Sequence, residues 1–128
     1  DQNRLALQLA ILHKHSGIAT FDQDVFINVV GGIKVSETAS DLVVMLAIVS
    51  SLRDKVIPSN WIAFGEVGLT GEVRPVYNAQ ERLSEAQKQG FEVAIIPKAN
   101  LPKKNIKGMK IISVRYLFEA IKYLLENS

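Results

Sequence analysis

The chain has 128 residues, of which 48% are hydrophobic and 22% are charged, and its formal net charge is +2. These values indicate one globular domain large enough to bury a core, and we interpret residues 1–128 as a single domain cut from a longer protein. The absence of cysteine excludes disulfides, cysteine nucleophiles and cysteine-ligated zinc within this sequence. No apolar run reaches the roughly 18 residues of a membrane helix, so we expect no membrane contact. We expect a cytoplasmic protein, with which the absence of cysteine is compatible.

The first half of the chain carries two helical patterns around one strand pattern. Apolar stripes predict a helix over Asn3–His15, and Val25–Val30 predicts a strand that Gly31-Gly32 interrupts. Apolar residues occupy nearly every side of Thr38–Arg53, which indicates a central, buried helix. The spacing from Thr38 to Asp41 is that of a capping box at the start of this helix.

The second half begins with a glycine-rich stretch, Phe64–Val76, in which Pro75 marks the end of a strand. The order of elements predicts an α/β or α+β domain with a mixed β-sheet packed with helices. The other predicted elements are a strand at Trp61–Phe64, a helix at Asn78–Gln89 ended by Gly90, a strand at Val93–Ile96 stopped by Pro97, a lysine-rich loop at Ala99–Gly108, a strand at Met109–Ser113 and a helix at Val114–Leu125.

Two kinds of binding site are disfavoured by spacing. The glycine-rich stretch is not followed by Gly-Lys-Ser/Thr and lacks the Gly-x-Gly-x-x-Gly spacing, so it predicts neither a Walker A loop nor a dinucleotide site. His13 and His15 are two residues apart on a predicted helix, which turns their side chains about 200° apart and prevents them from sharing a metal ion.

Several motifs in one order carry a family resemblance that covers essentially the whole chain. They are Asn28-Val29-Val30-Gly31-Gly32, Phe64-Gly65-Glu66-Val67-Gly68-Leu69-Thr70-Gly71-Glu72 and Pro97-Lys98-Ala99-Asn100. With these motifs the chain resembles the proteolytic domain of Lon proteases, and more closely the Lon-like C-terminal domain of the bacterial RadA (Sms) family of DNA repair proteins. The resemblance implies a Lon protease-like fold.

The resemblance also implies that this domain is not an enzyme. Lon proteases use a serine at the start of the buried helix and a lysine at the start of a later helix, and the matching positions here are Ala39 and Gln80. Alanine offers no nucleophile, and glutamine is not a base. The alternative, a residual serine peptidase, would use Ser40 or Ser36.

For the full-length protein the family implies a four-cysteine zinc finger and a RecA-like ATPase, neither of which this sequence contains. ATP, magnesium and zinc are therefore expected in the full-length protein and no cofactor in this domain. The implied activity is ATP-driven branch migration of recombination intermediates by a hexameric ring, with a recombinase as a further partner. This domain would serve as ring scaffold and as a sequence-independent surface for single-stranded and branched or duplex DNA.

Clustered cations support the expected contact with DNA. The stretch from Lys98 to Arg115 contains no acidic residue, and its lysines can neutralise phosphates without reading bases. No aromatic residue interleaves with these lysines, so the pattern does not predict base stacking. The alternatives are a solvated loop, or a protein-interaction module without DNA contact. The candidate DNA-binding residues are Lys34, Arg74, Lys98, Lys103, Lys104, Lys107 and Arg115.

Overall fold

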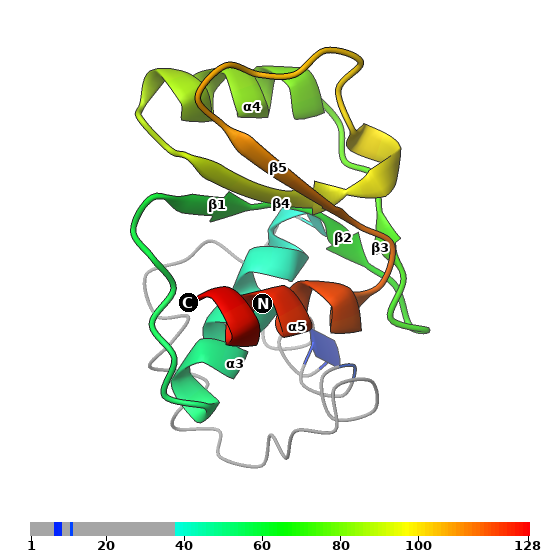
Figure 1. Cartoon of the computed structure of the whole chain (residues 1–128). Coiled ribbons are helices and arrows are strands. Elements are labelled where there is room, and N and C mark those ends of the chain that lie inside the picture. The colour runs from blue at the N-terminus through cyan, green and yellow to red at the C-terminus, as the bar shows by residue number, and fades with distance from the viewer. Residues whose placement is uncertain (1–6, 9–10, 12–37) are drawn as a thin grey trace.

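A computed structural model of the chain describes residues 7–8, 11 and 38–128 (Figure 1). The predicted strand Val25–Val30 and most of the predicted helix Asn3–His15 lie outside the described residues, although Leu7, Gln8 and Ile11 are helical. The described elements are η1 (Thr38–Ser40), α3 (Asp41–Leu52), β1 (Trp61–Ala63), β2 (Glu66–Val67), β3 (Val73–Arg74), α4 (Ala79–Lys88), β4 (Val93–Pro97), η2 (Lys98–Asn100), β5 (Lys110–Val114) and α5 (Leu117–Asn127).

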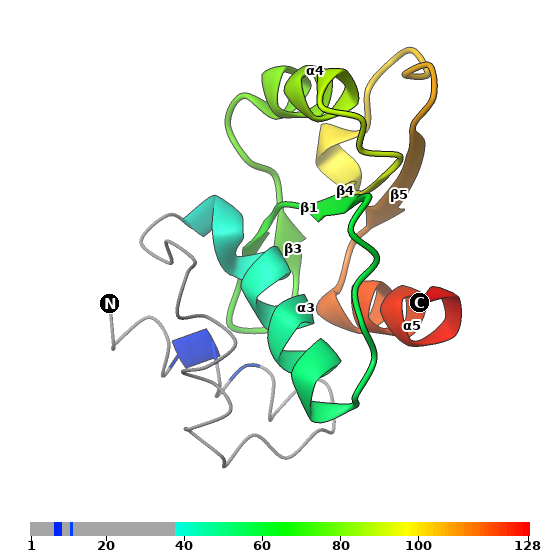
Figure 2. The ribbon, with the colours of Figure 1, turned by 90° about the vertical axis from the view of Figure 1, so that its left-hand side faces the viewer.

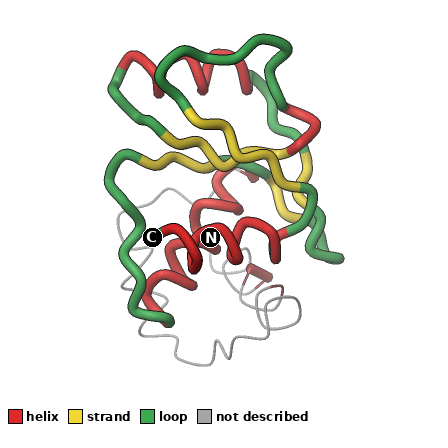
Figure 3. The backbone as a smooth tube through the Cα atoms, viewed as in Figure 1, coloured by secondary structure: helices red, strands yellow, loops and turns green. Residues whose placement is uncertain are grey.

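The described strands form a parallel sheet of order β1-β4-β5 and a separate antiparallel ribbon of β2 and β3 (Figure 3). Ala63 pairs with Ile95, which pairs with Ile112 on its other side. Because β4 and β5 are neighbours and parallel, the chain must travel back along the whole sheet between them. Residues 98–109 make this return crossing.

Helices cover both faces of the sheet, with α4 on one side and α3 and α5 on the other (Figures 1 and 2). Side chains alternate along a strand, so neighbouring residues enter different layers. Ala94 and Ile96 of β4 pack on the α4 side with Leu83, whereas Ile95 between them packs with α3 and α5. The described part of the chain is therefore α/β with helices on both faces, as its order of elements predicts. The predicted mixed sheet does not occur among the described strands, because the antiparallel pair β2–β3 is separate from the parallel sheet.

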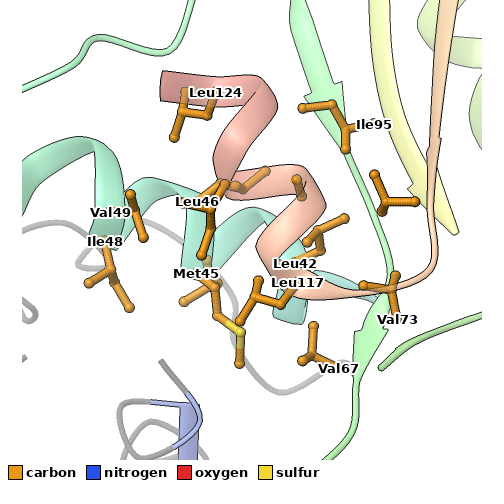
Figure 4. Close-up of a cluster of buried hydrophobic side chains, with 14 of the residues drawn as sticks. Leu42, Met45, Leu46, Ile48, Val49, Val67, Val73, Ile95, Leu117 and Leu124 are labelled. Atoms are coloured by element: carbon orange, nitrogen blue, oxygen red, sulfur yellow. The ribbon is translucent and has the colours of Figure 1, made fainter. Parts of the chain in front are cut away.

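Helix α3 lies at the centre of the larger cluster, and its predicted burial is confirmed. Figure 4 shows Leu42, Met45 and Leu46 gathered with Leu117 and Leu124 of α5. Burying each such side chain contributes about 1.5–3 kcal/mol, so the contact of α3 with α5 is a main source of stability. The described helices are all too short or too polar to traverse a lipid bilayer.

The predicted ends of the later elements are partly correct. Helix α4 stops just before Gly90, whose φ of +90° suits glycine, and strand β3 ends directly before Pro75. Helix α5 begins at Leu117, three residues later than predicted, because Tyr116 is extended and forms an antiparallel bridge with Glu72 beside the β2–β3 ribbon. In that arrangement Val73 N donates to the Arg115 carbonyl at 2.8 Å.

The start of α3 is held by the backbone at Gly65. Gly65 N donates to the Ala39 carbonyl at 2.9 Å, and Leu42 N donates to the Gly65 carbonyl at 3.0 Å. Gly65 has a φ of +155°, and a Cβ there would lie 2.9 Å from Cγ1 of Val73. Only glycine combines this backbone conformation with such close packing.

We predict that Gly65→Ala lowers the free energy of unfolding by about 2–3 kcal/mol, since the added methyl group must displace Val73 and strain the backbone. Urea unfolding followed by circular dichroism measures this loss. The matched control is Gly108→Ala, at a φ of +77° with no atom within 4 Å of the added Cβ. Gly108→Ala should lower the free energy of unfolding by about 1 kcal/mol, because it strains the backbone without displacing any side chain. Equal losses in the two variants would contradict the packing argument at Gly65.

Candidate nucleic-acid interface

The two positions of the expected lost dyad lie in different surroundings. Ala39 lies in η1 and lines an open hollow of about 550 Å³, the Ala39 hollow. Gln80 is exposed on the first turn of α4 and is not among the described residues that line this hollow. Those residues include the hydroxyl of Thr38 but no lysine or histidine. They are Thr38, Ala39, Glu66, Pro75, Val76, Tyr77 and Arg82.

The serines considered for a residual peptidase have separate positions. Ser36 lies outside the described residues, and Ser40 is the N-cap residue of α3. Farther along α3, the Ser50 hydroxyl donates to the carbonyl of Lys55. The carboxylate of Asp41, predicted to cap the helix, makes two tertiary contacts: Oδ1 accepts from Gln8 Nε2 and Oδ2 accepts from Val67 N, both at 3.0 Å.

The lysine loop, residues 101–109, presents its cations to solvent from a fixed backbone. Figure 1 shows it in orange beside α4. Ile106 and Met109 pack into the cluster on the α4 side of the sheet, and Gln87 Nε2 of α4 donates to the Lys107 carbonyl at 2.7 Å. Lys103, Lys104 and Lys107 are all exposed. The apolar side chains thus anchor the loop while the lysines face outward.

Lys98 and Arg115 are brought together by the register of the parallel sheet. Pro97 at the end of β4 pairs with Val114 at the end of β5, so the two exposed cations leave adjacent strands at the same edge. Lys110 lies at the opposite edge, where it pairs with Val93 and its Nζ approaches the Tyr123 ring to 5.8 Å. The candidate cations therefore run from the carboxyl edge of the sheet along the lysine loop. Lys34 lies outside the described residues.

Arg74 has two carboxylate partners in the β2–β3 ribbon. Its Nη1 lies 3.2 Å from Oε1 of Glu66, and its Nη2 lies 2.9 Å from Oε2 of Glu72. These hydrogen bonds, above all that to Glu72, raise the pKa of Arg74. A phosphate would have to compete with both carboxylates for this guanidinium. The role of Arg74 in DNA binding stays a prediction, and its observed contacts are within the ribbon.

Glu72 also closes the turn between β2 and β3. Its Oε1 accepts from Thr70 Oγ1 at 2.6 Å and from Thr70 N at 3.1 Å. The hydroxyl of Thr70 is the largest cause that lowers the pKa of Glu72, from its ordinary value of 4.5 to about 2. Gly68 faces this carboxylate so closely that a Cβ would lie 2.3 Å from Cδ of Glu72. The turn is consequently shaped around the Glu72 side chain.

Sequence reasoning missed an exposed pair of aromatic rings beside Arg115. Tyr116 and Phe118 stack with their ring centroids 5.9 Å apart and an interplanar angle of 18°. The predicted helix start at Val114 placed both residues inside a helix, where they would have been two positions apart on different sides. A better signal is Glu119, three residues after Tyr116, which accepts from Tyr116 N at 2.9 Å and so marks the true helix start. No group of three His, Cys, Asp or Glu side chains suited to a metal occurs among the described residues.

Residues 4–100 match a protein-family model described as subunit ChlI of Mg-chelatase. The chain is also similar to curated proteins named DNA repair protein RadA. It is 58% identical to the protein of Escherichia coli (strain K12) over 94% of this chain and 26% of that protein, and 58% identical to that of Pseudomonas aeruginosa over 98% and 28%. The chain is 50% identical to the protein of Aquifex aeolicus over 97% of this chain and 28% of that protein. The chain spans about a quarter of the length of these relatives.

We predict that Glu72→Gln destabilises the fold at neutral pH and much less at low pH. The pKa of Glu72 is depressed by folding, so its contribution is present above about pH 4.5 and is lost as the pH falls to about 2. Urea midpoints of wild type and variant, measured from pH 7 to pH 2, should therefore converge across this window.

The companion variant Thr70→Ala removes the largest cause of the depressed pKa. In that background the effect of Glu72→Gln should disappear at a higher pH than in the wild type. A difference between wild type and Glu72→Gln that stayed constant down to pH 2 would show that Glu72 does not contribute as a charged group.

Proposed function

The chain belongs to the family described as subunit ChlI of Mg-chelatase, and from its likeness to RadA proteins we propose that it is a DNA-binding domain of a DNA repair protein. The proposal follows the RadA relatives because their similarity extends over 94–98% of this chain. Since the chain spans only about a quarter of those proteins, it would supply one part of a larger activity.

The lysine loop is the observation that carries this proposal. Three exposed lysines project from a backbone that is held by Ile106, Met109 and the bond to Gln87. The sequence between Pro97 and Glu119 contains no carboxylate that would offset them. Cations placed in this way suit phosphates, which are recognised without regard to base sequence. The domain would therefore bind single-stranded and branched or duplex DNA with a strong dependence on salt.

The proposed whole protein is a RecA-like ATPase that migrates branches in recombination intermediates. Its ATP, magnesium and zinc would be held by domains other than this one, and a recombinase would be a partner in the cytoplasm. The Lon-like domain would also act as scaffold for a hexameric ring. These assignments rest on the resemblance of the sequence motifs to the RadA family, and the names of the relatives support the DNA repair role.

The proposed domain is not proteolytic. Ala39 at the start of the buried helix carries only a methyl group, and the exposed Gln80 lies outside the lining of the Ala39 hollow. The described lining provides no amine or imidazole that could act as general base for a serine. The fold would thus be kept for binding and assembly.

We predict that Lys103→Glu/Lys104→Glu weakens duplex DNA binding and flattens its salt dependence. Each lost phosphate contact should reduce the log–log salt slope by about 0.9, so the double variant should lose roughly 2 from the slope. Fluorescence anisotropy of a labelled duplex, titrated with the chain at several salt concentrations, gives both affinity and slope.

The matched control is Arg53→Glu/Lys55→Glu, which changes net charge by the same amount at two exposed positions after α3. It should shift affinity only through long-range electrostatics and leave the slope close to that of the wild type. Equal effects of the two double variants would mean that overall charge, rather than the lysine loop, determines binding.

We predict that the chain does not hydrolyse labelled casein, and that Ser40→Ala gives the same background signal as the wild type. A rate that disappears in Ser40→Ala would overturn the non-proteolytic assignment. Urea unfolding of the same samples verifies that both proteins are folded, so that an absent rate reports on chemistry.

A further inference from the structure

Two aromatic rings lie exposed at the carboxyl edge of the sheet. Tyr116 is 47% exposed and Phe118 is 58% exposed, although residues of this size usually bury most of their surface. The two rings are nearly parallel and stack on one another, so they form one exposed aromatic pair, the platform, instead of two separate side chains. Phe118 also borders two shallow hollows on α5, of about 280 and 370 Å³.

The backbone under this platform is fixed from both sides. Leu117 N donates to the Gly71 carbonyl and Val73 N to the Arg115 carbonyl, each at 2.8 Å. On the other side Oε1 of Glu119 accepts from the backbone N of both Arg115 and Tyr116 at 2.9 Å. The rings are therefore presented in a defined place, and a ligand that stacks on them need not order the chain first.

Cations neighbour the platform in the chain and at the same edge of the sheet. Arg115 precedes Tyr116 directly, and Lys98 leaves the adjacent strand at the same edge. Lys122 is one turn along α5 from Phe118 and lines both hollows. The carboxylates nearby are Glu119, which bonds the backbone, and Glu72, which bonds Thr70 and Arg74, together with Glu126, which lines both hollows.

We propose that the platform of Tyr116 and Phe118 binds an unpaired base of single-stranded DNA, whose phosphates contact Arg115 and Lys98. A flat aromatic surface beside cations is the combination that holds single strands, because every base has a face that can stack. Bases inside a duplex are already stacked, so the platform adds affinity only where a strand is open. This inference rests on the proposed DNA binding and adds to it a preference for exposed bases.

The test compares two fluorescein-labelled strands of 15 nucleotides that differ only in their bases, oligo-dT and an abasic strand with the same phosphates. The wild-type chain should bind oligo-dT at least roughly 10-fold more tightly, since one base stack on an aromatic side chain supplies that much. Tyr116→Leu/Phe118→Leu keeps apolar bulk but removes the rings, and it should abolish the preference while binding the abasic strand as before.

Tyr77→Leu is the matched control, because Tyr77 is an exposed aromatic residue that lines the Ala39 hollow and is not part of the stacked pair of Tyr116 and Phe118. It should keep the preference for oligo-dT. A second variant covers the case in which the double substitution does not fold: Phe118→Trp in a Trp61→Phe background, which leaves one tryptophan in the chain. Its fluorescence should be quenched by oligo-dT and not by the abasic strand.

The outcomes separate this inference from the function on which it rests. Equal wild-type affinity for the two strands, or a preference that survives in Tyr116→Leu/Phe118→Leu, overturns base stacking while leaving phosphate binding in place. A double variant that changes the sedimentation state of the chain but keeps the preference overturns it in favour of a self-association surface. No binding to either strand or to duplex at low salt overturns both the DNA-binding proposal and this inference.

Discussion

The fold depends on how the first turn of α3 is joined to the strand that leaves the sheet. Two backbone bonds connect Gly65 with Ala39 and Leu42, and the buried carboxylate of Asp41 holds Val67 N and Gln8. A charge without these donors would be costly to bury, so the bonds fix the helix and the ribbon relative to each other. The same bonds place Ala39 in the wall of its hollow. Structural requirements thus account for the contacts at this corner of the molecule.

Local sequence pattern predicted the elements whose form depends on their own residues. The burial of α3 follows from an apolar surface on nearly every side, and the end of α4 follows from Gly90. The strand at Val93–Ile96 and the stop at Pro75 follow from strong β propensity and from the missing proline donor. Such features are set by residues within a few positions of one another.

Contacts between residues that are far apart in the sequence could not be predicted from local sequence pattern. Asp41 has the spacing of a capping residue, yet its carboxylate bonds Val67, which is 26 positions away. The extended conformation of Tyr116 comes from its bridge to Glu72 at the ribbon, and Lys98 and Arg115 leave the same edge of the sheet only through the register of β4 and β5. The lysines could be counted from the sequence. Their arrangement around an edge with exposed aromatic rings could not, because it depends on which strands are neighbours.

The anchoring of the lysine loop has a consequence for its evolution and engineering. The return crossing between parallel strands fixes the path of residues 98–109, and Ile106 and Met109 hold it on the inner side. The exposed side chains of Lys103, Lys104 and Lys107 are not part of the core, so their charge can vary over a wide range at little cost in stability. Sheet topology therefore determines the backbone path of this segment, while the charge of each outward side chain is free to change with the ligand.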